Sequence, residues 1–142
     1  MRDSVFLDTN VVLDLLGERK EFYDNAARIV SLADQGQIKL AVSSLTYATT
    51  FYLLSRFENT ETVKTKIRKF KVLASTCDLT DAVVDKALNS TFNDFEDALQ
   101  YYCALNNHCN RIVTRNEKEF KTSAIIVMSP HEYLKSLSST SL

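Results

Sequence analysis

Four carboxylates stand where a protein could hold a divalent cation. Asp8 ends one apolar run, and Glu119 follows another. Asp94 and Asp97 are three residues apart, so on a helix their side chains share one face, whereas Glu96 points roughly elsewhere. Carboxylates that converge repel one another unless a cation lies among them. Hard oxygen ligands with no His or Cys nearby indicate Mg²⁺ or Mn²⁺.

Each of these acids also has a simpler structural explanation. Asp8 can be satisfied by the backbone N–H groups of a following helix. Asp94 and Asp97 suit a first helical turn, where the helix dipole favours negative charge, and Asn93 or Asp94 can act as the cap. Glu119 taken alone is an ordinary surface charge. A metal site is favoured only if the side chains converge.

Convergence requires a parallel sheet whose carboxyl edge gathers these residues. Short apolar segments alternate with helical patterns, which predicts an α/β fold, a three-layer α/β/α sandwich with a parallel sheet of about five strands. The predicted strands are Val5 to Leu7, Ile38 to Val42, Thr76 to Leu79, Arg111 to Thr114 and Ile125 to Met128. Ligands of open α/β sheets bind beyond the carboxyl ends of the strands, where the strand order reverses.

Caps and apolar periodicity define the helices between these strands. The predicted helices are Asn10 to Leu16, Lys20 to Gln35, Ser43 or Ser44 to about Phe57, Thr60 to Leu73, Thr80 to Leu88, Asp94 to Asn106, and one from Pro130. Gly36 suits the left-handed position after a helix. Ser129 and Glu132 form a capping box around Pro130. The expected organisation is a single domain over residues 1–137, with a frayed tail over 138–142.

The composition is that of an ordinary globular protein of 142 residues. Lys plus Arg number 17 against 18 Asp plus Glu, which neither proves nor excludes a nucleic-acid partner. There is no apolar run long enough for a membrane span and no signal-peptide pattern, so the cytoplasm is the expected location. Three scattered cysteines, Cys77, Cys103 and Cys109, are expected to be reduced and mostly buried.

Four motifs carry a resemblance to a known family. They are F-L-D-T-N-V-V-L-D-L-L near the start, D-F-E-D-A-L-Q-Y-Y-C-A in the middle, I-V-T-R-N-E-K-E-F after it, and M-S-P-H-E-Y-L near the end. In this order they resemble PIN domains, and among these the ribonuclease toxins of VapC type. The resemblance implies a parallel α/β/α sandwich, Mg²⁺- or Mn²⁺-dependent endoribonuclease activity on RNA, and an antitoxin protein as partner.

The resemblance also assigns roles to single residues. It implies catalytic roles for Asp8, Asp94, Asp97 and Glu119, metal binding by Asp8, Asp97 and Asp94, and supporting roles for Asn10, Thr114 and Asn116. The cation would lower the pKa of a bound water for attack on a phosphodiester, and Glu119 would help hold the cation or position the nucleophile. The family usually has a Glu where this chain has Thr49. The alternative is a catalytically weakened domain that binds RNA or a protein.

Lys64 to Lys71, K-T-K-I-R-K-F-K, is the only dense positive run. It is either a solvated helix face or a surface that contacts the RNA backbone. The candidate RNA-binding residues are Lys64, Lys66, Arg68, Lys69 and Arg115. The apolar residues Phe51, Tyr52, Leu53 and Phe57 suggest instead a homodimer face or a groove for an antitoxin helix, although aromatic residues at helical spacing are more often core.

Overall fold

The protein, described here as a computed structural model over residues 2–140, has one parallel sheet in the order β3-β2-β1-β4-β5. Its strands are β1 (Ser4–Leu7), β2 (Lys39–Ser43), β3 (Ala74–Cys77), β4 (Arg111–Val113) and β5 (Ile126–Met128). Every pairing between neighbouring strands is parallel. The predicted α/β/α class is confirmed.

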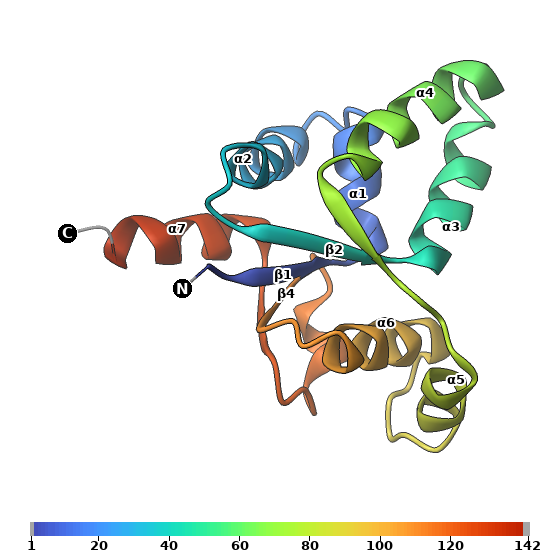
Figure 1. The fold of residues 1–142 in the computed structure, drawn as a ribbon, viewed down its shortest axis with the longest axis vertical. Coiled ribbons are helices and arrows are strands. Elements are labelled where there is room, and N and C mark those ends of the chain that lie inside the picture. Colours follow the sequence, from blue (N-terminus) through green and yellow to red (C-terminus); the bar gives the residue numbers. More distant parts are fainter. Residues whose placement is uncertain (1, 141–142) are drawn as a thin grey trace.

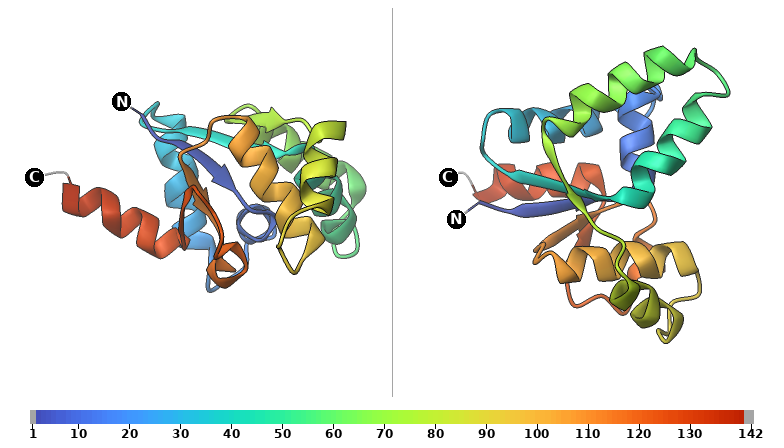
Figure 2. Two further views of the ribbon diagram at one scale, coloured as in Figure 1. Left: turned by 90° about the horizontal axis from the view of Figure 1, so that it is seen from below. Right: turned by 45° about the vertical axis from the view of Figure 1, so that its right-hand side comes forward.

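Helices cover both faces of this sheet (Figures 1 and 2). They are α1 (Thr9–Leu16), α2 (Tyr23–Asp34), α3 (Ser44–Leu54), α4 (Thr60–Lys71), α5 (Asp81–Leu88), α6 (Phe95–Asn106) and α7 (Pro130–Thr140), with a 3₁₀ turn at Glu117–Phe120. The first four helices and α7 pack on one face, whereas α5 and α6 pack on the other.

The central strand β1 is apolar because both of its faces are covered. Val5 and Leu7 belong to the core beneath α1 and α2, whereas Phe6 belongs to the core beneath α5 and α6. All three are at most 1% exposed. Alternate side chains of a strand point to opposite faces, so burial on both sides requires this continuous apolar run.

The strand order reverses at β1, which places a crevice at the carboxyl ends of β1 and β4. β1 pairs with β2 on one side and with β4 on the other. The chain first builds β1, β2 and β3 outward, then returns through α5 and α6 to add β4. Asp8 and Thr114 follow the last residues of these two strands and therefore lie side by side at the crevice.

Most predicted caps are confirmed, with one correction. Asp8 caps α1 by accepting the N–H of Thr9 at 2.8 Å, so this helix begins at Thr9 and not at Asn10 as predicted. Gly36 has a φ of +76°, as its position after α2 predicted. Ser129 and Glu132 exchange the two hydrogen bonds of a capping box, each 3.1 Å long.

Several boundaries differ by one to three residues from those predicted; α2, for example, begins at Tyr23 and not at Lys20, and α3 ends at Leu54 and not near Phe57. β3 begins at Ala74 and ends at Cys77, two residues earlier than predicted, because it pairs in register with Leu40 to Ser43 of β2. α7 continues to Thr140, past the predicted start of the tail at residue 138. Residues 141 and 142 of that tail lie outside the described part of the chain.

The three cysteines are free and buried, as predicted. Within residues 2–140, every helix is too short or too polar to cross a membrane.

Candidate metal centre

Asp8 is 4% exposed, and each of its carboxylate oxygens lies within hydrogen-bonding distance of two donors. Oδ1 accepts from the backbone N–H of Thr9 at 2.8 Å and from Nε2 of Gln100 at 3.2 Å. Oδ2 accepts from the hydroxyl of Thr114 at 2.7 Å and from Nδ2 of Asn10 at 3.4 Å. Burial of a carboxylate is costly without such partners. All four of these donors to Asp8 are neutral groups.

Asp97 is the second buried carboxylate of the crevice, at 8% exposed. It lies in the first turn of α6, where Asp94 is the cap and accepts the N–H of Asp97 at 3.0 Å. Burial raises the pKa of Asp97 to about 7, and the negative charges of Asp8, Asp94, Glu119 and Glu96 add to this effect. The predicted acids therefore lie within electrostatic range of one another.

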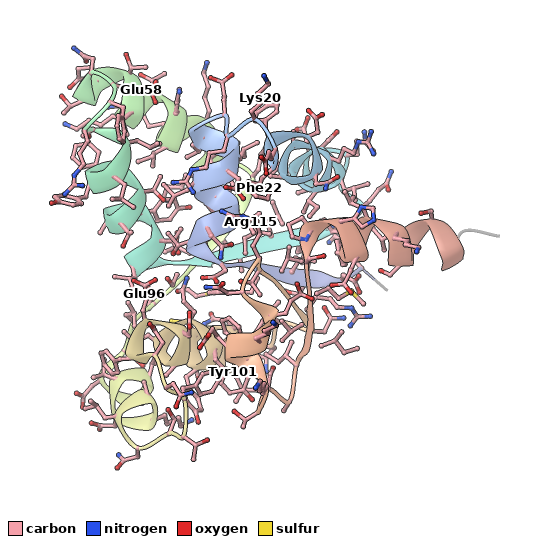
Figure 3. All side chains as sticks on the ribbon, turned by 180° about the vertical axis from the view of Figure 1, so that it is seen from behind. Lys20, Phe22, Glu58, Glu96, Tyr101 and Arg115 are labelled. Carbon is pink, nitrogen blue, oxygen red and sulfur yellow. The ribbon has the colours of Figure 1, made fainter. Side chains whose placement is uncertain are left out.

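Glu96, an exposed residue of the same first turn, also lies within electrostatic range of this acidic group. Its pKa is raised by burial, then by the charges of Asp8 and Asp94. Figure 3 shows Glu96 in the opening between the first turn of α6 and the foot of α3. Glu119 is exposed on the 3₁₀ turn.

The polar residues after β4 hold Asp8 through one hydroxyl. Thr114 is fully buried and donates to Asp8, while its oxygen accepts the N–H of Asn116 at 2.9 Å and lies 3.4 Å from Nδ2 of Asn10. Asn10 in turn accepts the N–H of Arg115 at 3.3 Å. The three predicted supporting residues thus contact Asp8 directly or through Thr114.

Sequence reasoning missed a second polar group on the other side of Asp8. Gln100, Thr9, Thr46 and Ser43 are all at most 5% exposed and are joined by hydrogen bonds. We call these four residues the Gln100 cluster. One signal was present, because Gln100 is a polar residue three positions after Asp97 within an otherwise apolar helix segment.

Thr49, where the family resemblance placed a Glu, lies on α3 and is partly buried. Thr46 and Thr50, on the same helix, are completely buried. Thr46 reaches Gln100 and Thr9, so neutral hydroxyls occupy the side of α3 that faces Asp8. This face of the crevice contributes no charge.

The donor set fits a small, hard cation. Mg²⁺ is usually bound through one or two carboxylates and keeps several waters. Asp8 and Asp97 supply two buried carboxylates, although no three His, Cys, Asp or Glu side chains within residues 2–140 form a complete ligand group. A cation here would also relieve the repulsion that raises the pKa of Asp97.

Of the predicted RNA-binding residues, two are paired with other parts of the fold and three are exposed on α4. Lys66 is tied to Glu58 at 2.7 Å and to the carbonyl of Leu16 at 3.1 Å. Arg115 pairs with buried Asp14 at 2.7 Å and lies over the ring of Phe22 (Figure 3). The others, Lys64, Arg68 and Lys69, are exposed on α4.

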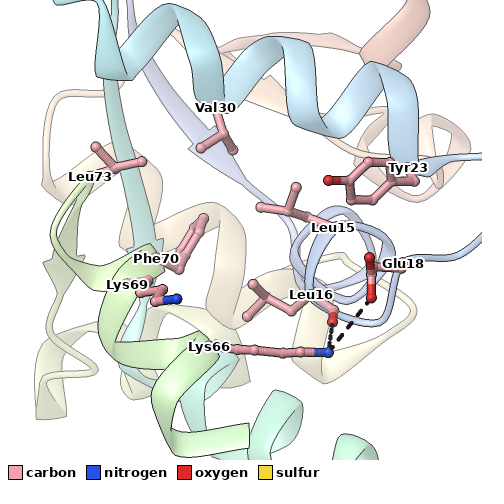
Figure 4. Close-up of a pocket in the computed structure, with 9 residues that line it drawn as sticks. All are labelled: Leu15, Leu16, Glu18, Tyr23, Val30, Lys66, Lys69, Phe70 and Leu73. Atoms are coloured by element: carbon pink, nitrogen blue, oxygen red, sulfur yellow. Dashed lines mark hydrogen bonds and ion pairs between the residues drawn. The ribbon is translucent and has the colours of Figure 1, made fainter. Parts of the chain in front are cut away.

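A separate apolar hollow of about 330 Å³ lies between α1, α2 and α4 (Figure 4). Its lining is Leu15, Leu16, Glu18, Tyr23, Val30, Lys66, Lys69, Phe70 and Leu73. Lys66 crosses one side of this hollow toward Glu18, at 3.9 Å. The hollow therefore combines an apolar floor with basic side chains, and it contains none of the carboxylates of the crevice.

Fold and site together define a parallel α/β/α protein with paired buried carboxylates at the carboxyl edge of its sheet. The family model described as PIN domain matches residues 4–118, so the chain belongs to the PIN domain family. This confirms the family that the four motifs predicted.

Individual proteins are similar to this chain in sequence or in fold. Ribonuclease VapC1 of Aquifex aeolicus (strain VF5) is 26% identical over 136 residues, covering 92% of this chain and 93% of that protein. The structure of VapBC2 from Rickettsia felis bound to a promoter DNA fragment has a TM-score of 0.66 at 20% identity, covering 89% of this chain and 98% of that one. A toxin-antitoxin complex from Klebsiella pneumoniae has a TM-score of 0.67 at 17% identity, covering 89% and 97%.

Proposed function

We propose that this protein is a Mg²⁺- or Mn²⁺-dependent endoribonuclease, the toxin of a toxin-antitoxin pair, acting in the cytoplasm. The observation that carries the proposal is the pair of buried carboxylates, Asp8 and Asp97, at the crevice where the strand order reverses. The similarity to a protein named a ribonuclease supports RNA as the substrate.

Each acidic residue has a distinct part in this proposal. Asp8 and Asp97, with Asp94 at the rim, hold the cation. A cation held there would supply an activated water for attack on phosphorus and would neutralise charge on the phosphate. Glu119, exposed at the mouth, orients that water. Thr114 keeps Asp8 in place by its 2.7 Å hydrogen bond, with Asn10 and Asn116 holding Thr114.

The test compares the wild-type protein with Asp8→Asn on a structured RNA, with Mg²⁺, with Mn²⁺ and with EDTA. Asp8→Asn keeps the shape of the side chain but removes its charge. We expect cation-dependent cleavage by the wild type and at least a hundredfold slower cleavage by the variant, since a ligand charge is lost. Equal cleavage by both proteins would point to a contaminating nuclease.

The absence of cleavage by either protein would favour the alternative, a PIN domain that binds RNA or protein without cutting. An RNA-binding measurement on the same samples then distinguishes a binding module from a protein with no RNA partner. The RNA-binding measurement is needed because Thr49 supplies no carboxylate to the site.

The protein partners that we propose are an antitoxin and a second copy of this chain. Similarity to a toxin-antitoxin complex supports the first. The apolar hollow with Lys69 at its edge suits a segment with apolar and acidic side chains. Tyr52 and Phe57, 61% and 85% exposed, support a self-associating face on the α3–α4 hairpin. Light scattering of wild type and of a Tyr52→Ser/Phe57→Ser variant tests the homodimer.

A further inference from the structure

Gln100 donates to Asp8 from a helix on the far side of the sequence, as does Thr114 from the segment after β4. Gln100 is separated from Asp8 by 92 positions and is completely buried. A buried amide is costly unless its polar atoms are satisfied. Here Nε2 lies 3.2 Å from Asp8 Oδ1, 3.1 Å from the Thr9 hydroxyl and 3.2 Å from the Thr46 hydroxyl. Three acceptors thus surround one NH₂ group that has two hydrogens.

The surroundings fix which end of the amide faces Asp8. Oε1 accepts a hydrogen bond from the hydroxyl of Ser43, the cap of α3. A flipped amide would turn Oε1 toward the Asp8 carboxylate and set two acceptors against each other. The charge of Asp8 therefore selects the orientation with N–H toward Asp8, and the Ser43 hydroxyl, which can donate or accept, matches it by donating to Oε1.

The Gln100 cluster also joins three helices at this point. Thr9 begins α1, Ser43 and Thr46 lie at the start of α3, and Gln100 comes from α6, one turn after Asp97. Thr9 and Thr46 bond each other at 2.9 Å. The position of Asp8 relative to Asp97 is consequently set by a network that includes the helix carrying Asp97.

We propose that Gln100 is a positioning residue for the metal site, one that holds Asp8 Oδ1 so that Asp8 and Asp97 bind the same cation. This inference rests on the proposed function. Gln100 touches neither substrate nor cation; it acts through Asp8. Outer-shell partners of metal ligands commonly contribute about 10–100-fold to metal affinity, and this side of Asp8 has no charged group to take the place of the amide.

The test is Gln100→Met, which keeps an unbranched side chain of similar length but has no N–H donor. Tyr101→Phe is the matched control, because it is the next residue of α6, is buried, and loses one hydrogen bond, to the N–H of Ala124, outside the Gln100 cluster. We expect Mn²⁺ affinity, measured by calorimetry without RNA, to fall about tenfold in Gln100→Met and to stay within about twofold in Tyr101→Phe.

Thermal unfolding in EDTA is measured for both variants to separate positioning from folding. A Gln100→Met protein that is folded but binds Mn²⁺ like the wild type overturns the inference and leaves the proposed function intact. A wild-type protein that neither binds Mn²⁺ nor cleaves RNA overturns the proposed function first.

A measurement on the unaltered protein keeps the inference testable if Gln100→Met does not fold. In a ¹⁵N-edited NMR spectrum, the side-chain NH₂ signals of Gln100 should shift on addition of Mg²⁺, because a cation on Asp8 withdraws charge from the oxygen that accepts this N–H. The side-chain NH₂ of Asn89, which bonds the Asp85 carbonyl on α5, is the reference. Gln100 signals that move no more than those of Asn89 contradict the inference.

Discussion

At the scale of single residues, two buried carboxylates at the same crevice have opposite surroundings. Asp8 accepts four hydrogen bonds from neutral donors. Asp97 is buried beside other acids, and its pKa is raised to about 7. The neighbouring carboxylates therefore disfavour the ionised form of Asp97, and a bound cation would favour it.

This difference predicts how stability changes with pH. A carboxyl group whose folded-state pKa lies above its unfolded value stabilises the fold at low pH and loses that contribution as pH rises through the folded value. In EDTA, the unfolding free energy should fall between about pH 4 and pH 7, by on the order of 2 kcal/mol from Asp97. Urea titrations at each pH measure this, with Asp97→Asn as the variant in which the fall is smaller.

The same titrations with Mg²⁺ give the complementary result. We expect Mg²⁺ to restore stability above pH 7 in the wild type but much less in Asp97→Asn, since the cation binds the ionised carboxyl group. If the unfolding free energy changes with pH identically in both proteins, Asp97 is not the cause of the fall in stability.

Thr49 offers a gain-of-function prediction at the same scale. If its lack of charge limits metal binding, Thr49→Glu should tighten Mn²⁺ affinity, because a further carboxylate adds to the charge that attracts the cation. Calorimetry with Mn²⁺ measures the change, and Thr49→Gln controls for side-chain size. An unchanged titration in Thr49→Glu refutes this account.

At the scale of elements, one ion pair fastens the segment after β4 to α1. Asp14 of α1 is 1% exposed and receives two hydrogen bonds from Arg115, at 2.7 and 3.1 Å. Arg19 lies 3.5 Å away as a second partner. Arg115 follows Thr114 directly, so this pair anchors the segment that holds Asp8 in place. The Arg115 guanidinium is therefore paired with Asp14 within the fold.

Arg115→Ala should therefore be destabilising even though the side chain is partly exposed. Without Arg115 the buried Asp14 carboxylate loses two hydrogen bonds and keeps only the 3.5 Å contact with Arg19, and breaking a buried pair in this way costs about 3 kcal/mol. Arg56→Ala is the matched control, since Arg56 also stacks on an aromatic ring, that of Tyr52, but at the surface. Urea unfolding should show a loss of less than about 1 kcal/mol for the control; equal losses would contradict the anchoring role.

At the scale of the whole molecule, α4, which carries the positive run Lys64 to Lys71, and the acidic crevice lie at opposite ends of α1. Asp8 caps the start of α1, whereas Lys66 of α4 bonds the carbonyl of Leu16 at its end. Eight residues of helix separate these points by about 12 Å. An RNA that contacts both must cross the surface alongside α1.

Salt dependence of RNA binding tests this path. Replacing the exposed residues Lys64, Arg68 and Lys69 with Ala should lower the slope of log affinity against log salt by about 2, since each phosphate contact on a single strand contributes about 0.7. The control removes three exposed lysines elsewhere, Lys39, Lys86 and Lys135. Equal slopes for the two triple variants would show that α4 acts only through net charge.

The sequence by itself determined the features that depend on near neighbours. Apolar alternation and caps located the strands and helices to within a few residues, and the motifs around Asp8, Asp97 and Glu119 predicted the family that residues 4–118 match. These signals are local, because a cap, a turn or a helix face involves residues only a few positions apart.

Only the tertiary structure decided which polar residues serve the site and which serve the fold. Gln100 meets Asp8 across 92 positions, and Arg115 meets Asp14 across 101. Whether a polar side chain is free or paired depends on the packing of helices that are distant in sequence. No local pattern carries that information, so an Arg beside the catalytic motif and a Gln within an apolar helix could be assigned only once the sheet had brought their partners together.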